Sequence, residues 1–128
     1  MITGLYAALI AVIYVTLSVR VITYRRAHKI GLGDDGNKSL MKRMRAQANC
    51  AEYAPFGLLL MALVELQDAA PSAVHLIGLM LLAGRAVHGY GFSMSPPVMI
   101  LRQAGMMLTF GSYLVSIFCL LYFALIWG

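Results

Sequence analysis

Three polar residues share one face of a predicted helix in a sequence that is otherwise strongly apolar. Arg45, Asn49 and Glu52 are spaced i, i+4, i+7, which places them on one side of an α-helix. Tyr53 follows directly, and Arg85 lies in a second apolar stretch. Because an ionisable side chain inside a membrane span costs a few kcal/mol, such residues indicate a functional site.

The depth of these charges in the two helices predicts that they meet. Glu52 lies seven residues beyond Arg45, and Arg85 lies seven residues before Phe92, so each is about 10 Å from the same end of its helix. We therefore expect Glu52 and Arg85 to form a pair, which is much less costly than either charge alone. A purely structural pair that holds two helices together is the competing interpretation.

A larger polar set crowds the same half of the predicted bundle and argues for more than a structural pair. It combines guanidinium, amide, phenol and imidazole groups, at Arg45, Asn49, Tyr53, His88 and Arg102. Guanidinium groups bind carboxylates through two parallel hydrogen bonds. The set predicts a cationic pocket for a small anion that carries carboxylates, and no metal ion is expected there.

Four apolar stretches must position these residues across a membrane. A spanning helix needs about 20 apolar residues, and in lipid the backbone must satisfy its own hydrogen bonds. We therefore predict an all-α integral membrane protein, a four-helix transmembrane bundle. Its helices are expected at about residues 2–24, 40–66, 72–92 and 98–127, and residues 1–128 are expected to form a single domain.

The composition excludes soluble and disordered chains, because hydrophobic residues make up 61% of the sequence and charged residues only 12%. Ten Lys and Arg against five Asp and Glu give a net charge of +5. A membrane-embedded chain has little exposed surface for nucleic acid, so anionic lipid headgroups and an anionic small substrate are the expected partners. Cys50 and Cys119 are too far apart in sequence to suggest a disulfide framework.

The distribution of basic residues predicts the orientation. All ten lie in the half of the bundle that holds the first and third connections, and basic residues favour the cytoplasmic side. We therefore expect a multi-pass protein, in a bacterial inner membrane or in an organelle membrane with its basic end on the cytosolic face, and with both termini on the non-cytoplasmic side. The first apolar stretch has no basic region before it, so it is interpreted as a retained anchor and not as a signal peptide.

Two motifs resemble those of a known family. The segment RAQANCAEYAPF at residues 45–56 resembles the second-helix signature of the MAPEG superfamily, the membrane-associated proteins in eicosanoid and glutathione metabolism. That signature is Arg-Ala-x-x-Asn-x-x-Glu followed closely by Pro. The segment GRAVHGYGF at residues 84–92 looks like the third-helix motif, Arg-x-x-His/Tyr. The motifs look most like those of the small bacterial branch, which includes YecN-type inner-membrane proteins.

The resemblance implies a homotrimer of four-helix bundles that binds glutathione, as a substrate, between neighbouring subunits at the cytoplasmic end. Carried over by motif, the glutathione-binding residues would be Arg45, Gln47, Asn49, Glu52, Tyr53, Arg85 and His88, joined by Arg26 or its neighbour Arg25.

Two positions depart from the pattern of the eukaryotic enzymes. Phe92 stands where their third-helix motif usually has Tyr. Arg102 is the candidate for the thiol-activating Arg at the start of the fourth helix, although its spacing from Arg85 differs. A free thiol has a pKa of about 8.5, and a nearby guanidinium favours the nucleophilic thiolate. The resemblance thus implies a glutathione S-transferase or peroxidase-like enzyme that conjugates glutathione to an apolar electrophile from the lipid.

Two alternatives follow from the same sequence. The first is a non-catalytic membrane scaffold of the same fold that binds lipid or glutathione, as the resemblance also allows. The second is a small multidrug transporter with four spans. Such transporters need a carboxylate within the first helix, and residues 2–24 contain none, so the transporter is disfavoured.

Overall fold

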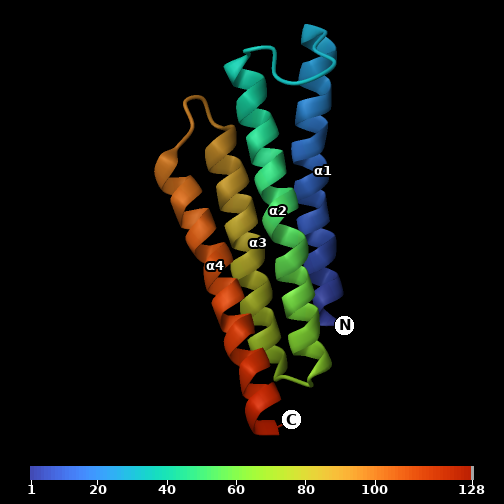
Figure 1. Cartoon of the computed structure of the whole chain (residues 1–128), viewed down its shortest axis with the longest axis vertical. Coiled ribbons are helices and arrows are strands. Elements are labelled where there is room, and N and C mark those ends of the chain that lie inside the picture. Colours follow the sequence, from blue (N-terminus) through green and yellow to red (C-terminus); the bar gives the residue numbers. More distant parts are fainter. Residues whose placement is uncertain (128) are drawn as a thin grey trace.

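The computed structural model describes residues 1–127 and consists of helices that lie side by side (Figure 1). They are α1 (Ile2–His28), α2 (Lys38–Leu66), α3 (Pro71–Ser93) and α4 (Met99–Tyr122), followed by a π-helical segment, Phe123–Trp127. Each of the four helices is long and apolar enough to cross a membrane. The prediction of an all-α four-helix membrane bundle is therefore confirmed, and the number of subunits stays a prediction.

The helix boundaries differ from the predicted ones mainly around the first connection. α1 continues four residues past Tyr24 to His28, because basic side chains in its last turn suit the negative end of the helix dipole. Lys29 then ends the helix in the left-handed conformation, with φ 55°. α2 starts two residues earlier than expected, where Asn37 caps the helix by accepting a hydrogen bond of 3.0 Å from the Leu40 N–H.

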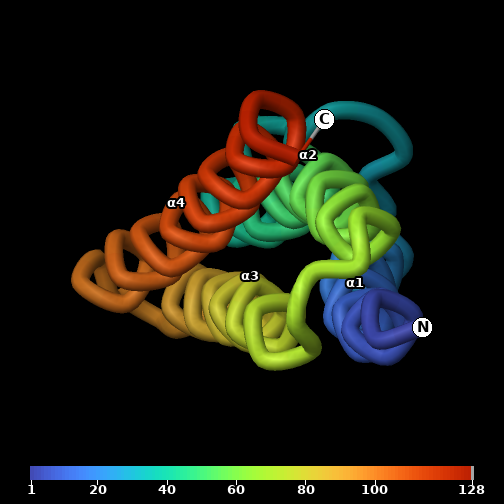
Figure 2. Tube along the Cα trace, turned by 90° about the horizontal axis from the view of Figure 1, so that it is seen from below, coloured from blue at the N-terminus to red at the C-terminus, as the bar shows by residue number. Residues whose placement is uncertain are grey.

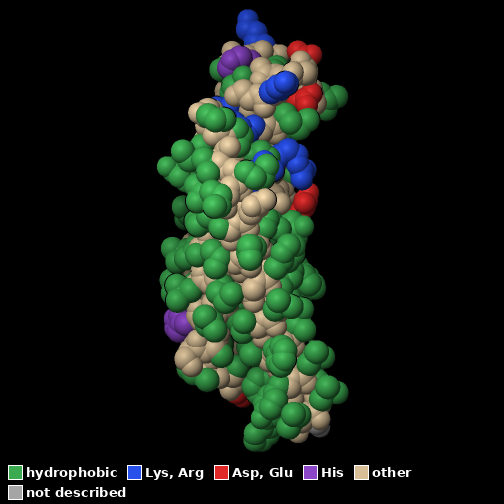
Figure 3. Space-filling model, turned by 90° about the vertical axis from the view of Figure 1, so that its left-hand side faces the viewer, with side chains coloured by type: hydrophobic (Ala, Val, Ile, Leu, Met, Phe, Trp, Pro, Cys, Tyr) green, Lys and Arg blue, Asp and Glu red, His purple; other side chains and the backbone are tan. Residues whose placement is uncertain are grey.

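The charged residues gather at one end of the bundle. The α1–α2 and α3–α4 connections lie at that end, while the N-terminus and the far end of α4 lie at the other (Figure 1). Figure 3 shows Lys and Arg side chains at the first end and a long apolar surface below it. α4 is inclined to the other helices, as the view along the bundle shows (Figure 2).

Glycines bring α3 and α4 close together beside the candidate site. A Cβ atom at Gly84 would lie 2.8 Å from the Gly105 carbonyl oxygen, and one at Gly105 would lie 2.6 Å from the backbone nitrogen of His88. Both distances are too short for a real side chain, so glycine is required at both positions. This approach places Arg85 and His88 of α3 directly against α4.

At the opposite end, a carboxylate joins α2 to the start of α1. Glu65 accepts hydrogen bonds from the backbone N–H groups of Ile2 (2.5 Å) and Thr3 (3.0 Å), which no residue within the helix can satisfy.

We expect Glu65→Ala to lower the free energy of unfolding by about 1–2 kcal/mol, the usual effect of losing a helix cap. Thermal unfolding in detergent, followed by circular dichroism, measures the loss. Asp68→Asn, at an exposed acidic residue of the same end, is the control, and equal melting of both variants would contradict the cap.

Candidate functional site

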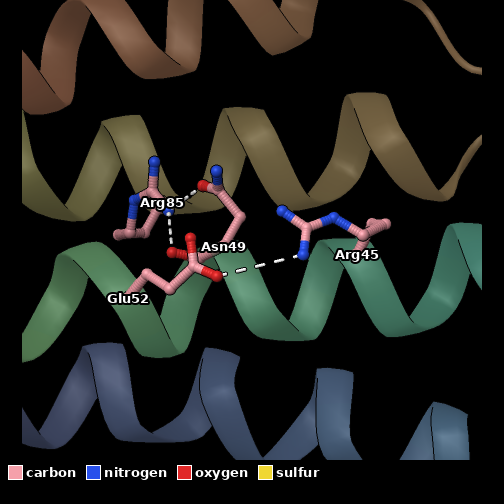
Figure 4. Close-up of polar contacts among 4 residues, drawn as sticks. All are labelled: Arg45, Asn49, Glu52 and Arg85. Carbon is pink, nitrogen blue, oxygen red and sulfur yellow. Dashed lines mark hydrogen bonds and ion pairs between the residues drawn. The ribbon is translucent and has the colours of Figure 1, made fainter.

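The site is built around a buried guanidinium. Arg85 is only 1% exposed. Its Nη1 donates to the Asn49 side-chain oxygen at 2.6 Å and to the Asn49 carbonyl oxygen at 3.2 Å (Figure 4). Its Nε and Nη2 donate to the Thr109 hydroxyl at 3.2 and 3.0 Å, and Nη2 also contacts the Met106 sulfur at 3.3 Å. Arg85 thus ties α2, α3 and α4 together through neutral acceptors.

The expected Glu52–Arg85 pair is wrong within one chain. Among residues 1–127, the ion pair that is present joins Arg45 Nη1 to Glu52 Oε1 at 3.9 Å (Figure 4). Arg45 and Glu52 are about two turns apart, so they share one face of α2, whereas Asn49 is rotated by about 40–60° from them towards α3. The depth estimate was sound, but this rotation puts Asn49, and not Glu52, against the guanidinium.

The Arg45–Glu52 pair lies on the outer side of α2. The two side chains are 50% and 55% exposed, although they belong to a helix that can span a membrane. Contact with hydrocarbon would be costly for both charges. In one chain alone, Arg45 and Glu52 therefore remain open to a ligand or to another protein surface. They lie about one helical turn before and after Asn49.

Tyr53 lies beside the Arg85 guanidinium, and His88 is buried about one helical turn further along α3. The Tyr53 ring centroid is 5.7 Å from the Arg85 Cζ, and the Tyr53 carbonyl oxygen accepts a hydrogen bond of 2.6 Å from the Tyr113 hydroxyl. His88 is 4% exposed. Arg85 and His88 are both buried in this chain, and of the two it is Arg85 that contacts Asn49.

Arg102 is held by an aromatic ring. Its Cζ lies 3.8 Å from the centroid of the Phe92 ring, a cation–π contact. The Arg102 Nε is buried and has no hydrogen-bond partner among the residues that the structure describes. Phe92, where this chain departs from the eukaryotic motif, is therefore the residue on which the candidate thiol-activating Arg102 stacks. The Arg102 side chain as a whole is half-buried.

Two predicted site residues lie away from the others within one chain. The Gln47 side chain donates to the Tyr14 hydroxyl at 3.2 Å, so it faces α1 and points away from Arg45. Arg26 is exposed and lines a shallow cavity of about 420 Å³ at the end of α1, together with Arg25. A single chain does not gather Arg45, Gln47 and Arg26 into one pocket.

Sequence reasoning missed Thr109. Thr109 is fully buried, accepts from Arg85 and donates to the Gly105 carbonyl oxygen at 2.8 Å. Its signal in the sequence was a hydroxyl four residues after a glycine within an apolar span, a pattern typical of close helix packing in membranes.

The comparisons with known proteins support the resemblance. The MAPEG family profile matches residues 3–122. Similar proteins include the inner membrane protein YecN of Escherichia coli (strain K12) and that of Escherichia coli O6:H1 (strain CFT073). Each is 37% identical over 92 residues, which cover 72% of this chain and 70% of the relative. The family inferred from the motifs at residues 45–56 and 84–92 is thereby confirmed, and the chain belongs to the MAPEG family, which includes glutathione transferases.

Proposed function

We propose that the protein is a membrane-bound glutathione S-transferase or peroxidase-like enzyme that conjugates glutathione to an apolar electrophile. The observation that carries the proposal is the half-exposed Arg45–Glu52 pair on the outer face of α2, within the motif of the family. Glutathione carries two carboxylates and an ammonium group. Arg45 can hold a carboxylate, and Glu52 can hold the ammonium group.

A neighbouring subunit would complete this site. The half-exposed charges of α2 would otherwise face lipid, and a second copy covers them while it brings further polar side chains to the same place. Gln47 and Arg26, which one chain leaves apart from Arg45, are candidates for such contributions. The family resemblance favours three subunits.

We expect native mass spectrometry from mild detergent to release three chains together, because burial of the charged α2 faces between subunits removes the cost of exposing them to lipid. The double variant with Arg45→Leu and Glu52→Leu removes both charges and, with them, the proposed contacts to glutathione. We expect it to assemble as the wild type does but not to bind glutathione. A monomeric wild-type protein that binds glutathione would contradict an intersubunit site.

In the proposed reaction, Arg102 stabilises the thiolate of glutathione. The thiol proton leaves to solvent, and the sulfur then forms a bond to the electrophilic carbon while the leaving group departs with its electron pair. Arg102 is half-buried, and its positive charge near the sulfur would favour the thiolate over the thiol. Phe92 holds the guanidinium in place, and Arg85 is a positioning residue that fixes Asn49.

The test is a conjugation assay with purified protein, glutathione and an apolar aryl halide, with a lipid hydroperoxide as a second substrate for peroxidase activity. Product formation that depends on both glutathione and protein supports the enzyme. Saturable glutathione binding without turnover of either substrate would favour the alternative, a non-catalytic lipid- or glutathione-binding scaffold. The observation that favours this alternative is Phe92, which supplies no hydroxyl where the eukaryotic motif usually has one.

We place the protein in a bacterial inner membrane with its basic end in the cytoplasm. The YecN relatives, which are named as inner membrane proteins of Escherichia coli, support the location. The gathering of Lys and Arg at the end that holds the α1–α2 connection supports the orientation (Figure 3). Both termini then lie on the non-cytoplasmic side.

A further inference from the structure

We propose that the basic end of the bundle carries a second site, separate from the glutathione face, which holds one anionic phospholipid. The phosphate lies between Arg20 of α1 and Arg43 of α2, and an acyl chain lies in the groove between α1 and α3.

The polar part of this site is a small cavity with two cations. Arg20, Thr23, Tyr24 and Arg43 line a space of about 230 Å³. No carboxylate within residues 1–127 lies within ion-pair distance of Arg20 or Arg43, since the pair that is present joins other residues. Two guanidinium groups on one cavity repel each other unless an anion lies between them, and guanidinium is well suited to phosphate.

Contacts around the cavity hold Arg43 and Tyr24 in place before any ligand arrives. The Arg43 Cζ lies 4.5 Å from the centroid of the Tyr24 ring, and Arg43 Nη1 donates to the Ser39 carbonyl oxygen at 3.1 Å. The Tyr24 ring stacks on His28 at 3.9 Å, and its hydroxyl donates to Asn37 at 3.0 Å. Because these side chains are already ordered, binding an anion costs little conformational entropy.

The depth of Arg20 matches the phosphates of a bilayer. Residues 2–19 carry no charge, and as a helix they span about 27 Å, close to the thickness of the hydrocarbon. Arg20 is the first charged residue beyond that stretch. Its guanidinium therefore lies where phospholipid phosphates begin.

An apolar groove beside the cavity favours a phospholipid over a free anion as the ligand. Arg20 also lines a groove of about 410 Å³ between α1 and α3, whose walls include Val12, Leu17, Ala86 and Tyr90. One residue thus joins a cationic cavity to an apolar groove that runs along the spanning part of the bundle. That combination fits a phosphate with an attached acyl chain.

The site is independent of the proposed function. Arg43 precedes Arg45 by two residues, a rotation of about 200° along a helix, so the two arginines point to nearly opposite sides of α2. The lipid site can therefore be present whether or not the protein binds glutathione.

The test is native mass spectrometry of the delipidated full-length protein, incubated with equimolar phosphatidylglycerol and phosphatidylcholine of identical acyl chains. We expect phosphatidylglycerol to be retained preferentially, at one molecule per chain. Arg20→Gln and Arg43→Gln should each lower its retention about tenfold, which corresponds to about 1.4 kcal/mol, and Arg43→Lys should lower it less. Lys38→Gln, which removes a charge at the same end, should change it less than about twofold.

A second pair of variants tests the groove. Ala86 and Ala83 are both exposed on α3, but only Ala86 lines the groove, so Ala86→Phe should lower lipid retention and Ala83→Phe should not. Equal retention of the two lipids, or an equal loss in Lys38→Gln, would overturn the site. If inorganic phosphate displaces the lipid at millimolar concentration and Ala86→Phe has no effect, the cavity binds free anions and the lipid assignment is wrong.

Discussion

Replacement of Arg102 by leucine is expected to lower the rate of glutathione conjugation about 10²–10³-fold, the usual effect of removing one donor that stabilises developing charge at a reacting centre. Glutathione affinity should stay within about twofold of wild type, because the guanidinium favours the thiolate more than the bound thiol. The expectation rests on the contact of Arg102 with the Phe92 ring at 3.8 Å, which fixes a half-buried guanidinium at the basic end of the bundle.

The measurement combines steady-state kinetics with ultraviolet absorbance of the thiolate during a glutathione titration at neutral pH. Wild type should form thiolate, and Arg102→Leu should not. Arg43→Leu, which removes a cation at the same end of the bundle but in a different cavity, on the opposite side of α2 from Arg45, is the matched control and should behave as wild type. Unchanged rate and thiolate absorbance in Arg102→Leu would mean that Arg102 only anchors α4 in the headgroups.

The second large effect concerns stability and the partner of Arg85. Asn49→Leu should lower the free energy of unfolding by about 1.5–3 kcal/mol, because the buried guanidinium loses its shortest hydrogen bond, at 2.6 Å. In a double-mutant cycle with Arg85→Leu, the two losses should not add, because removal of Arg85 also removes the group that Asn49 satisfies. Unfolding in detergent by a denaturant titration gives the four free energies.

A parallel cycle distinguishes this pairing from the one that the spacing predicted. Glu52→Gln and Arg85→Leu should be additive within about 0.5 kcal/mol, since Glu52 faces Arg45 and not Arg85. Strong coupling of Glu52 to Arg85, with additive losses for Asn49, would contradict the network observed here.

The fold could be predicted because the membrane leaves few alternatives. Four predominantly apolar stretches of sufficient length can only be helices in lipid, and their number and approximate positions were right. The extension of α1 through Arg25 to His28 was not predicted, because the polar residues were assigned to the connection. Helix ends depend on caps and on local conformation, here Lys29 at positive φ, which hydropathy does not report.

The candidate site could be predicted in composition and depth but not in its contacts. The rise per residue correctly placed Glu52 and Arg85 at a similar level, but it says nothing about the direction of a side chain around the helix axis. That direction decided between Asn49 and Glu52 as the partner of Arg85. The cation–π contact between Arg102 and Phe92 was also out of reach, because it depends on how the connection after Ser93 turns the chain into α4.

Calorimetric titration of glutathione into the detergent-purified protein tests the central proposal most directly. Binding should be saturable in wild type, weakened at least about tenfold by Arg45→Leu, which removes a charge-assisted contact to a carboxylate, and unchanged by Arg43→Leu, which removes a cation on the opposite side of α2. The absence of saturable binding in wild type, or equal affinity in Arg45→Leu, would contradict a glutathione site on the outer face of α2.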